Sequence, residues 1–270
     1  MDRKIAFQFT RQRWFPRPLK RMMAEFLDFM VGMAQANHPF LPLLNEVLAH
    51  SQARTLVGFR ALEGGGLAHI AADVGGPVNA ELSVVLTDEH PDASRATRVQ
   101  QLASRPVEVL TCSPREAAER WRGRGIAAFI NTFHKLDTGE DRAALETLVA
   151  HDLDVVIGEG NNKSFRQVFG MTVLVPLTVL LLTPLIKPQR FWRYVFTYLV
   201  PILPLVIVWD GVAALFRLHR PEELEALAKS LGREDYVWKA GKRDNKRGGF
   251  VIYLMGYRTS GKNANSKFQE

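Results

Sequence analysis

Two apolar runs lie between segments that have the composition of β-strands, and this order limits what the chain can fold into. The runs cover residues 168–186 and 195–208, and a short basic linker separates them. Strand-like sequence precedes the pair at 153–158 and follows it at 250–255. If these strands share one sheet, the runs form a hairpin with both ends on the same side of any membrane. The hairpin then crosses twice, dips in and returns, or covers an apolar site.

The length of the runs argues against a double crossing. A spanning helix needs about 20 apolar residues, which the first run barely provides and the second does not. Prolines interrupt both runs, at positions 176, 184, 201 and 204. A crossing would also carry Lys187, Arg190 and Arg193 to the far side, against the usual bias of basic residues. We predict a helical hairpin over 165–218 that lies in one leaflet or folds over the site as a lid; a buried dimer interface is the alternative.

The charge of the chain favours a membrane partner. The net charge is +7, and the basic residues gather in clusters, one of them in the hairpin linker. Basic clusters beside apolar helices are typical of contacts with anionic lipids. They lack the interleaved aromatic residues of a nucleic-acid-binding surface, so we expect no nucleic acid partner.

Cysteine and histidine usage narrows the chemistry. Cys112 is the only cysteine, so the chain forms no intrachain disulfide and no cysteine-based metal cluster. The seven histidines show no metal-ligand spacing, and we expect no metal. The first residues lack the apolar core of a signal peptide. We therefore expect a cytoplasmic protein that is peripheral or monotopic at the inner membrane.

The rest of the chain alternates between strand and helix patterns. Strands are predicted at 55–59, 82–87, 107–110, 125–130 and 153–158, helices at 67–73, 114–122 and 140–151, and a helix and two closing strands at 221–231, 236–238 and 250–257. Such alternation predicts an α/β fold with a doubly wound, mostly parallel sheet. An amphipathic helix at 16–37 and a short helix at 43–50 precede it, with apolar residues at three- and four-residue steps in the first.

Polar residues and glycines follow the predicted strands, where doubly wound sheets form their sites. They are Glu63, Gly64, Gly65, Gly66, Asp88, Cys112, Asn131, His134 and Glu159. A glycine-rich turn after the first strand lets the backbone approach a ligand closely. An acid about 20 residues further on, at the end of the second strand, can accept the hydroxyl groups of a ribose. The pattern indicates a nucleotide or nucleoside ligand.

Nearly the whole chain resembles bacterial class I S-adenosylmethionine-dependent methyltransferases, in a subgroup with an apolar insertion after the fifth strand. The similar segments are 14–16, 63–66, 86–91, 131–134, 182–188, 209–211, 221–224 and 253–257, together with Glu159 and Arg217. The resemblance implies a seven-stranded sheet with the last strand antiparallel. It divides the chain into an N-terminal helical cap (1–50), a Rossmann-like methyltransferase domain (51–164 and 219–258), the apolar hairpin (165–218) and a flexible tail (259–270).

The resemblance also assigns roles. Gly64, Gly65 and Gly66 would approach the amino-acid part of S-adenosylmethionine, and Asp88 would hold its ribose. Thr111 and Cys112 would border the adenine. The segment from Asn131 to His134 would face the methyl donor. Where the family has an acid after the first strand, this chain has Gly58, Phe59 and Arg60, so that only Glu63 could take the acid's place.

Two residues are candidates for catalysis. His134 is the candidate general base, because it follows the fourth strand at the mouth of the predicted site. The alternative for His134 is a hydrogen bond to a loop carbonyl. Glu159 is the second candidate, and its alternative is to cap a helix or to pair with Lys163.

Two functions follow. The first is methyl transfer from S-adenosylmethionine to an oxygen or nitrogen of a hydrophobic or lipid-like small molecule at a membrane. The second, favoured by the altered loop after the first strand, is an inactive methyltransferase-fold scaffold or partner subunit of a membrane-associated complex. The expected assembly is a homodimer or a complex with a partner subunit. A dinucleotide-binding reductase is disfavoured because the glycines run together instead of following a GxGxxG pattern.

Overall fold

The structure is a computed structural model that describes residues 6–63, 66–75, 82–89, 93–103, 105–160, 165–245 and 249–259. The chain divides into two compact units. The helical unit consists of Met1–Ala36 and Asn161–His219, and the sheet unit of Asn37–Gly160 and Arg220–Glu270.

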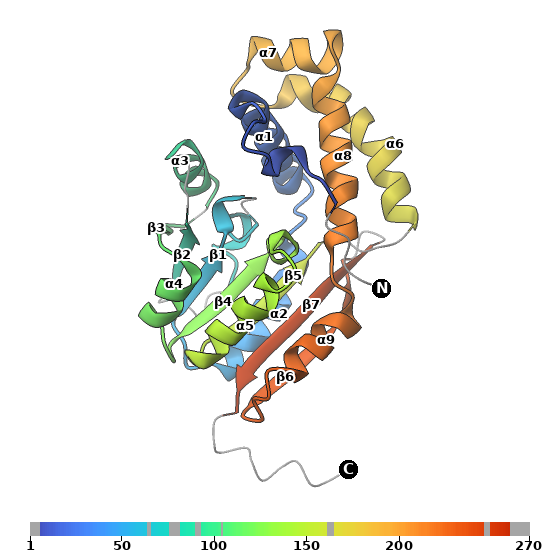
Figure 1. Cartoon of the computed structure of the whole chain (residues 1–270). Helices are drawn as coiled ribbons and strands as arrows, with labels where there is room; N and C mark the ends of the chain where they lie inside the picture. Colours follow the sequence, from blue (N-terminus) through green and yellow to red (C-terminus); the bar gives the residue numbers. More distant parts are fainter. Residues whose placement is uncertain are drawn as a thin grey trace. The chain divides into compact units, whose positions relative to one another are not determined.

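The sheet unit contains a seven-stranded sheet with the order β3-β2-β1-β4-β5-β7-β6 (Figure 1). The strands are β1 (Thr55–Phe59), β2 (Ser83–Asp88), β3 (Glu108–Thr111), β4 (Gly125–Ile130), β5 (Asp154–Glu159), β6 (Tyr236–Asp244) and β7 (Phe250–Arg258). Strands β1 to β5 pair in parallel, and β7 runs antiparallel to both β5 and β6. This arrangement confirms the predicted doubly wound, mostly parallel sheet.

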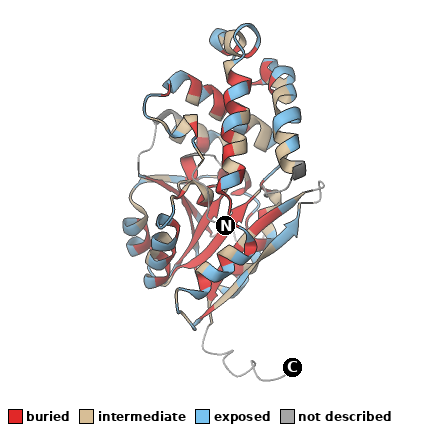
Figure 2. Cartoon of the chain, turned by 45° about the vertical axis from the view of Figure 1, so that its right-hand side comes forward, coloured by how far each residue is buried: buried red, intermediate tan, exposed pale blue. Residues whose placement is uncertain are grey.

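Helices cover both faces of the sheet, so its central strands are buried. Every residue of β4 and β5 is buried (Figure 2). Neighbouring residues of β1 enter different cores, because successive side chains of a strand point to opposite faces. Leu56 packs with residues of α2 (Leu41–His50) and α3 (Ala93–Leu102). Val57 belongs to the core that α4 (Pro114–Arg120), α5 (Glu140–Ala150) and α9 (Pro221–Lys229) form on the other face.

Two local predictions in the sheet unit were wrong. The helix expected at 67–73 is a single 3-10 turn, Ala68–Ile70. Helix α3 was not predicted, because its sequence is polar and Val99 supplies its buried apolar contact. The predicted start of the helix at residue 114 is confirmed: Ser113 is the N-cap of α4. The structure adds a reciprocal capping box between Ser113 and Glu116.

The helical unit packs α1 (Arg17–Met33) with α6 (Phe165–Leu182) and α8 (Ile202–Arg217). Its core is apolar and consists of Phe15, Leu19, Met22, Met23, Phe26, Val179, Ile186, Leu203, Val206 and Ile207. Between α6 and α8 lie a 3-10 turn (Thr183–Leu185), α7 (Phe191–Tyr194) and a π-helical turn (Val195–Leu199). The second apolar run is therefore not one helical arm: its two parts are bent by 78° at a break before Ile202.

Among the described residues, one helix is long and apolar enough to cross a membrane. It covers Gln167–Leu185, with a mean hydropathy of 2.1 and 11% of its residues buried. The bent pair Phe191–Leu199 and Ile202–Arg217 would add a second span if the pair were one segment. Length and composition support these spans, and core helices can meet the same two criteria.

The boundary between the units lies inside the N-terminal region that was expected to form one cap over 1–50. Residues 1–36 belong to the helical unit because α1 buries Met22 and Phe26 in that unit's core. Residues 37–50 belong to the sheet unit because α2 buries Leu44 and Val47 against the strands.

Candidate functional site

The candidate residues lie where the parallel strands of the sheet unit end. Asp88 is the last residue of β2, Asn131 follows β4, and Glu159 is the last residue of β5. Since β1 separates β2 from β4, Asp88 and Asn131 stand about two strand spacings apart, roughly 10 Å. These residues therefore share one edge of the sheet, as expected for a doubly wound fold.

The structure joins the two predicted catalytic residues in one pair. The Glu159 carboxylate accepts a hydrogen bond from the His134 backbone N–H, with an N–Oε1 distance of 2.9 Å. Its other oxygen, Oε2, lies 2.8 Å from Nδ1 of the His134 ring. The backbone contact matches one alternative for Glu159, since it caps the 3-10 turn Phe133–Lys135, while the contact with the ring pairs Glu159 with His134. The other alternative, an ion pair with Lys163, involves a residue outside the described part of the chain.

The His134–Glu159 pair is largely buried. The side chains of His134 and Glu159 are only 12% and 5% exposed. A buried carboxylate is costly unless hydrogen bonds satisfy it, and His134 supplies two. When Glu159 is ionised it can only accept, so Nδ1 of the ring donates to it and Nε2 is the acceptor nitrogen of a neutral imidazole. In that form His134 can accept a proton at Nε2 while Glu159 fixes the orientation of the ring.

A second set of contacts connects three loops at the same edge. Asn131 has a left-handed backbone, with φ of 58°. Its side-chain Oδ1 accepts from the Gly160 N–H at 2.7 Å, and its Nδ2 donates to Asn37 Oδ1 at 2.8 Å. Asn37 in turn donates to the Gly66 carbonyl at 2.8 Å. The chain Gly66–Asn37–Asn131–Gly160 holds the end of the glycine-rich loop to the ends of β4 and β5.

Asn37 was not among the sequence candidates. It was read as the end of an amphipathic helix, and 94 residues separate it from Asn131. Its exposed fraction is 1%, which is unusual for asparagine unless its amide groups are paired. No spacing in the sequence could have linked Asn37 to Gly66.

The close packing at Gly66 gives a testable prediction. A methyl group added at Gly66 would lie 2.6 Å from the backbone carbonyl oxygen of Ile130 in β4, which cannot rotate away. We expect Gly66→Ala to lower the free energy of unfolding by about 1–3 kcal/mol, measured by chemical denaturation. The control is Gly170→Ala in α6, where the added methyl group meets nothing within 4 Å. That variant should match or exceed wild-type stability, and equal stability of Gly66→Ala would contradict the packing.

Asp88 and Cys112 form the other side of the site. Asp88 is 8% exposed, pairs with Thr111 across the strands, and accepts the Cys112 N–H at its carbonyl oxygen (3.2 Å). A pocket of about 320 Å³ opens beside Cys112. It is lined by Leu110, Thr111, Cys112, Glu116 and Arg120. Leu110 and Cys112 give this pocket an apolar part, and Thr111, Glu116 and Arg120 give it a polar part.

The Cys112 side chain is a neutral thiol. Burial raises the pKa of the Cys112 thiol and the Glu116 carboxylate raises it further, while Arg120 lowers it. Thiolates are the nucleophilic form of cysteine. Cys112 therefore lines the pocket and is no candidate nucleophile.

Some sequence candidates lie outside the described residues. These are Gly64, Gly65 and the side chain of Glu63. Arg60, which stands near the position where the family has an acid, has a left-handed backbone with φ of 50°. Within the described part of the chain, no group of three or more His, Cys, Asp or Glu residues could hold a metal ion.

The strand order with one antiparallel strand, and a site at the ends of β2 and β4, define a class I methyltransferase-like α/β fold. The chain is similar to the solved structure of the plantazolicin methyltransferase BamL in complex with a triazolic desmethylPZN analog and SAH. The two share 10% identity over 91% of this chain and 93% of BamL, with a TM-score of 0.55.

Two further structures are less similar. The methyltransferase domain of bacterial CtHen1-CN shares 15% identity, over 82% of this chain and 99% of that one, with a TM-score of 0.46. A putative O-methyltransferase from Klebsiella pneumoniae shares 11% identity, over 91% of each chain, with a TM-score of 0.41. No family model and no curated protein matches the sequence. The likeness to BamL establishes the fold.

Proposed function

We propose that the protein is an S-adenosylmethionine-dependent methyltransferase that acts on an oxygen or nitrogen of a hydrophobic or lipid-like small molecule at a membrane surface. The observation that carries this proposal is the buried His134–Glu159 pair at the ligand-binding edge of the sheet. The similar fold of BamL, whose structure contains SAH and a triazolic desmethylPZN analog, supports the cofactor.

The described residues fit S-adenosylmethionine. Asp88 places a buried carboxylate at the end of β2, where it can accept two ribose hydroxyl groups. Gly66 lies directly against β4, so the loop leaves no room for a side chain there. The pocket beside Cys112, with a volume of about 320 Å³ at the end of β3, can receive a flat base.

When bound, the cofactor supplies an electrophilic methyl group. The protein's part is to align the acceptor atom and exclude water, which accounts for much of the rate in such reactions. His134 accepts the proton that a hydroxyl or amine acceptor loses, at Nε2. Glu159 keeps the ring in the orientation that this transfer requires and stabilises the imidazolium that results. Asn131 and Asn37 hold the loops on either side of the reacting groups.

The hydrophobic acceptor and the membrane location are supported by the helical unit. Fifteen of its hydrophobic side chains between Phe169 and Phe216 are exposed. Exposed apolar surface of this extent marks a site of interaction with a membrane or with another protein. We assign the protein to the cytoplasmic face of the inner membrane, as a peripheral or monotopic enzyme.

A second candidate function is an inactive methyltransferase-fold scaffold or partner subunit. Arg60 favours it, because the residue stands beside the cofactor loop where the family has an acid. A guanidinium group near a cationic sulfonium ligand weakens binding through repulsion of like charges.

Calorimetric titration with S-adenosylmethionine tests the proposal. We expect binding in the micromolar range, and Asp88→Ala should weaken it about 30-fold or more, because two hydrogen bonds to an ionised carboxylate are lost. The control is Asp73→Ala, which removes an exposed acid of the same unit that faces His38 at 3.5 Å. No binding by folded wild-type protein would refute the enzyme and leave the scaffold as the function.

A further inference from the structure

Exposed apolar side chains gather at the end of the helical unit that connects α6 to α8. This end, residues 181–205, is called the tip. More than half of the surface of each of the following side chains is exposed: Leu181, Leu185, Phe191, Trp192, Leu199 and Leu205. Single exposed apolar residues are ordinary in soluble proteins, whereas this concentration within 25 residues marks an interaction surface.

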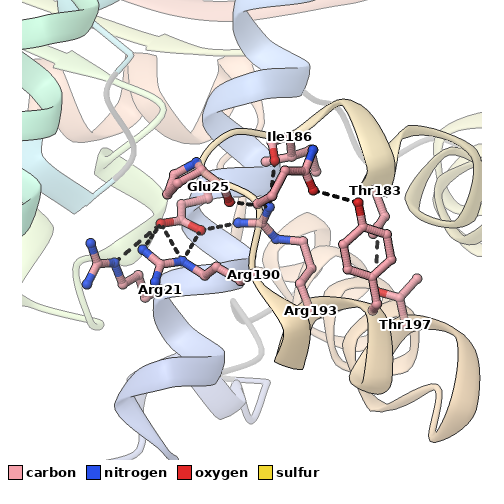
Figure 3. A network of polar contacts seen from close by, with 10 residues as sticks. Arg21, Glu25, Thr183, Ile186, Arg190, Arg193 and Thr197 are labelled. Atoms are coloured by element: carbon pink, nitrogen blue, oxygen red, sulfur yellow. Dashed lines mark hydrogen bonds and ion pairs between the residues drawn. The ribbon is translucent and has the colours of Figure 1, made fainter.

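Basic groups lie in the same part of the unit. The Glu25 carboxylate of α1 accepts hydrogen bonds from Arg21 (3.3 Å) and Arg190 (3.1 Å) and from the fully buried Arg193 (Figure 3). Three guanidinium groups therefore share one carboxylate, which leaves an excess of positive charge around it. The side chains of Arg21 and Arg190 are 53% and 31% exposed, so this charge reaches solvent. Lys187 is exposed in the same linker.

The ion pairs also decide between the possible topologies of the hairpin. Arg190 and Arg193 of the tip are bonded to Glu25, so the tip and α1 must lie on the same side of a membrane. Helix α1 carries Arg17, Lys20 and Arg21 in its first turns. Moving these ionised groups through a bilayer with the tip would cost several kcal/mol for each of them. A tip that enters one leaflet, with α1 at the surface, avoids this cost.

The residue types at the tip suit a lipid interface. Aromatic and basic side chains together are typical of the boundary between headgroups and acyl chains. Phe191 and Trp192 are adjacent, with ring centroids 5.6 Å apart, and both are largely exposed. The tip thus combines side chains that enter the acyl region with cations that contact lipid phosphate groups.

We propose that the tip docks on a bilayer that contains anionic lipids, with Phe191, Trp192 and Leu199 inserted and with Lys187 and Arg190 at the phosphate groups. The purpose of this docking rests on the proposed function. Docking adds to that function the surface from which a hydrophobic acceptor enters. A second copy of the chain is the rival occupant. An isologous tip-to-tip dimer would bring two basic clusters together, which disfavours that pairing.

Flotation of the purified full chain with lipid vesicles tests the docking. One vesicle population is phosphatidylcholine alone, and the other contains about a third phosphatidylglycerol as the anionic lipid. We expect the protein to float with the anionic vesicles, to bind the neutral ones at least tenfold more weakly, and to be released by high salt. The assay contains neither S-adenosylmethionine nor acceptor, so its result is independent of whether the enzyme proposal holds.

Variants identify the docking surface. Phe191→Ala combined with Trp192→Ala should lower vesicle affinity at least tenfold, since both side chains are exposed and their loss leaves the core intact. Lys187→Glu should lower it at least about fivefold, in anionic vesicles only. The matched control is Trp14→Ala, which removes an equally exposed tryptophan (66%) that lies outside the tip. Circular dichroism establishes that each variant is folded.

Three outcomes overturn the proposal. Equal binding to neutral and anionic vesicles removes the role of the basic cluster. Loss of binding in Trp14→Ala, with the tip variants unaffected, places the docking surface elsewhere. Failure to float, together with a dimer in light scattering that the Phe191 and Trp192 changes dissociate, assigns the tip to a second copy of the chain.

Discussion

His134→Ala is expected to lower the rate of methyl transfer by about 10²–10⁴-fold while leaving the affinity for S-adenosylmethionine unchanged. A positioned general base contributes a factor of this size. Glu159 holds the His134 ring through a contact of 2.8 Å between Oε2 and Nδ1, so the direction of the other ring nitrogen, Nε2, is fixed. Removing the ring takes away the proton acceptor but none of the groups assigned to the cofactor. The loss should therefore appear in kcat, measured with a methyl-labelled cofactor and an acceptor identified from a lipid extract.

Two further variants separate a role in proton transfer from a role in folding. His151→Ala is the matched control, since the His151 side chain is as buried (13% exposed) and lies in the same unit, after α5. It should leave kcat near the wild-type value. Glu159→Gln keeps the size of the side chain but removes its charge, and should lower kcat by about 10-fold or more with little change in KM. Wild-type kcat in His134→Ala would show that the acceptor loses its proton to another group.

Sequence reasoning found the members of this pair but not their contact. His134 and Glu159 were each assigned from their place after a strand, and strand positions were predictable because apolar runs and turn residues alternate along the chain. Their contact depends on β4 and β5 being neighbours, which follows from the sheet order. Asn37 could not be found in this way, because its partners come from loops after β1 and β4 and its own segment precedes the sheet.

Some features of the helical unit could not be predicted from the sequence either. The apolar composition of residues 195–208 suggested one arm, because hydropathy does not register a bend. The backbone turns at Val200 and Pro201, and a π-helical turn precedes them. Asp210 of α8 is buried. Its carboxylate accepts the N–H groups of Phe9 (2.7 Å) and Thr10 (2.9 Å), contacts that only the fold brings together.

Arg193→Ala is expected to destabilise the helical unit by about 3–5 kcal/mol. Arg193 is fully buried and donates to Glu25 and to the carbonyl oxygens of Ile186 (2.8 Å) and Pro188 (3.0 Å). Its removal leaves the carboxylate of Glu25, itself 2% exposed, with one buried partner fewer, and breaking one side of a buried ion pair has this cost. Denaturant titration, followed by the fluorescence of the unit's tryptophans, measures the loss.

The comparison with Arg21→Ala shows whether burial, and not charge alone, gives the effect. Arg21 bonds the same carboxylate but is 53% exposed, and exposed ion pairs contribute only about 0–1 kcal/mol. A double variant, Glu25→Leu with Arg193→Met, removes both buried charges and should recover most of the stability lost in Arg193→Ala, since apolar side chains of similar size can replace a buried pair. If Arg193→Ala were no more harmful than Arg21→Ala, the ion pairs would not fix the tip to α1, and a crossing hairpin would again be allowed.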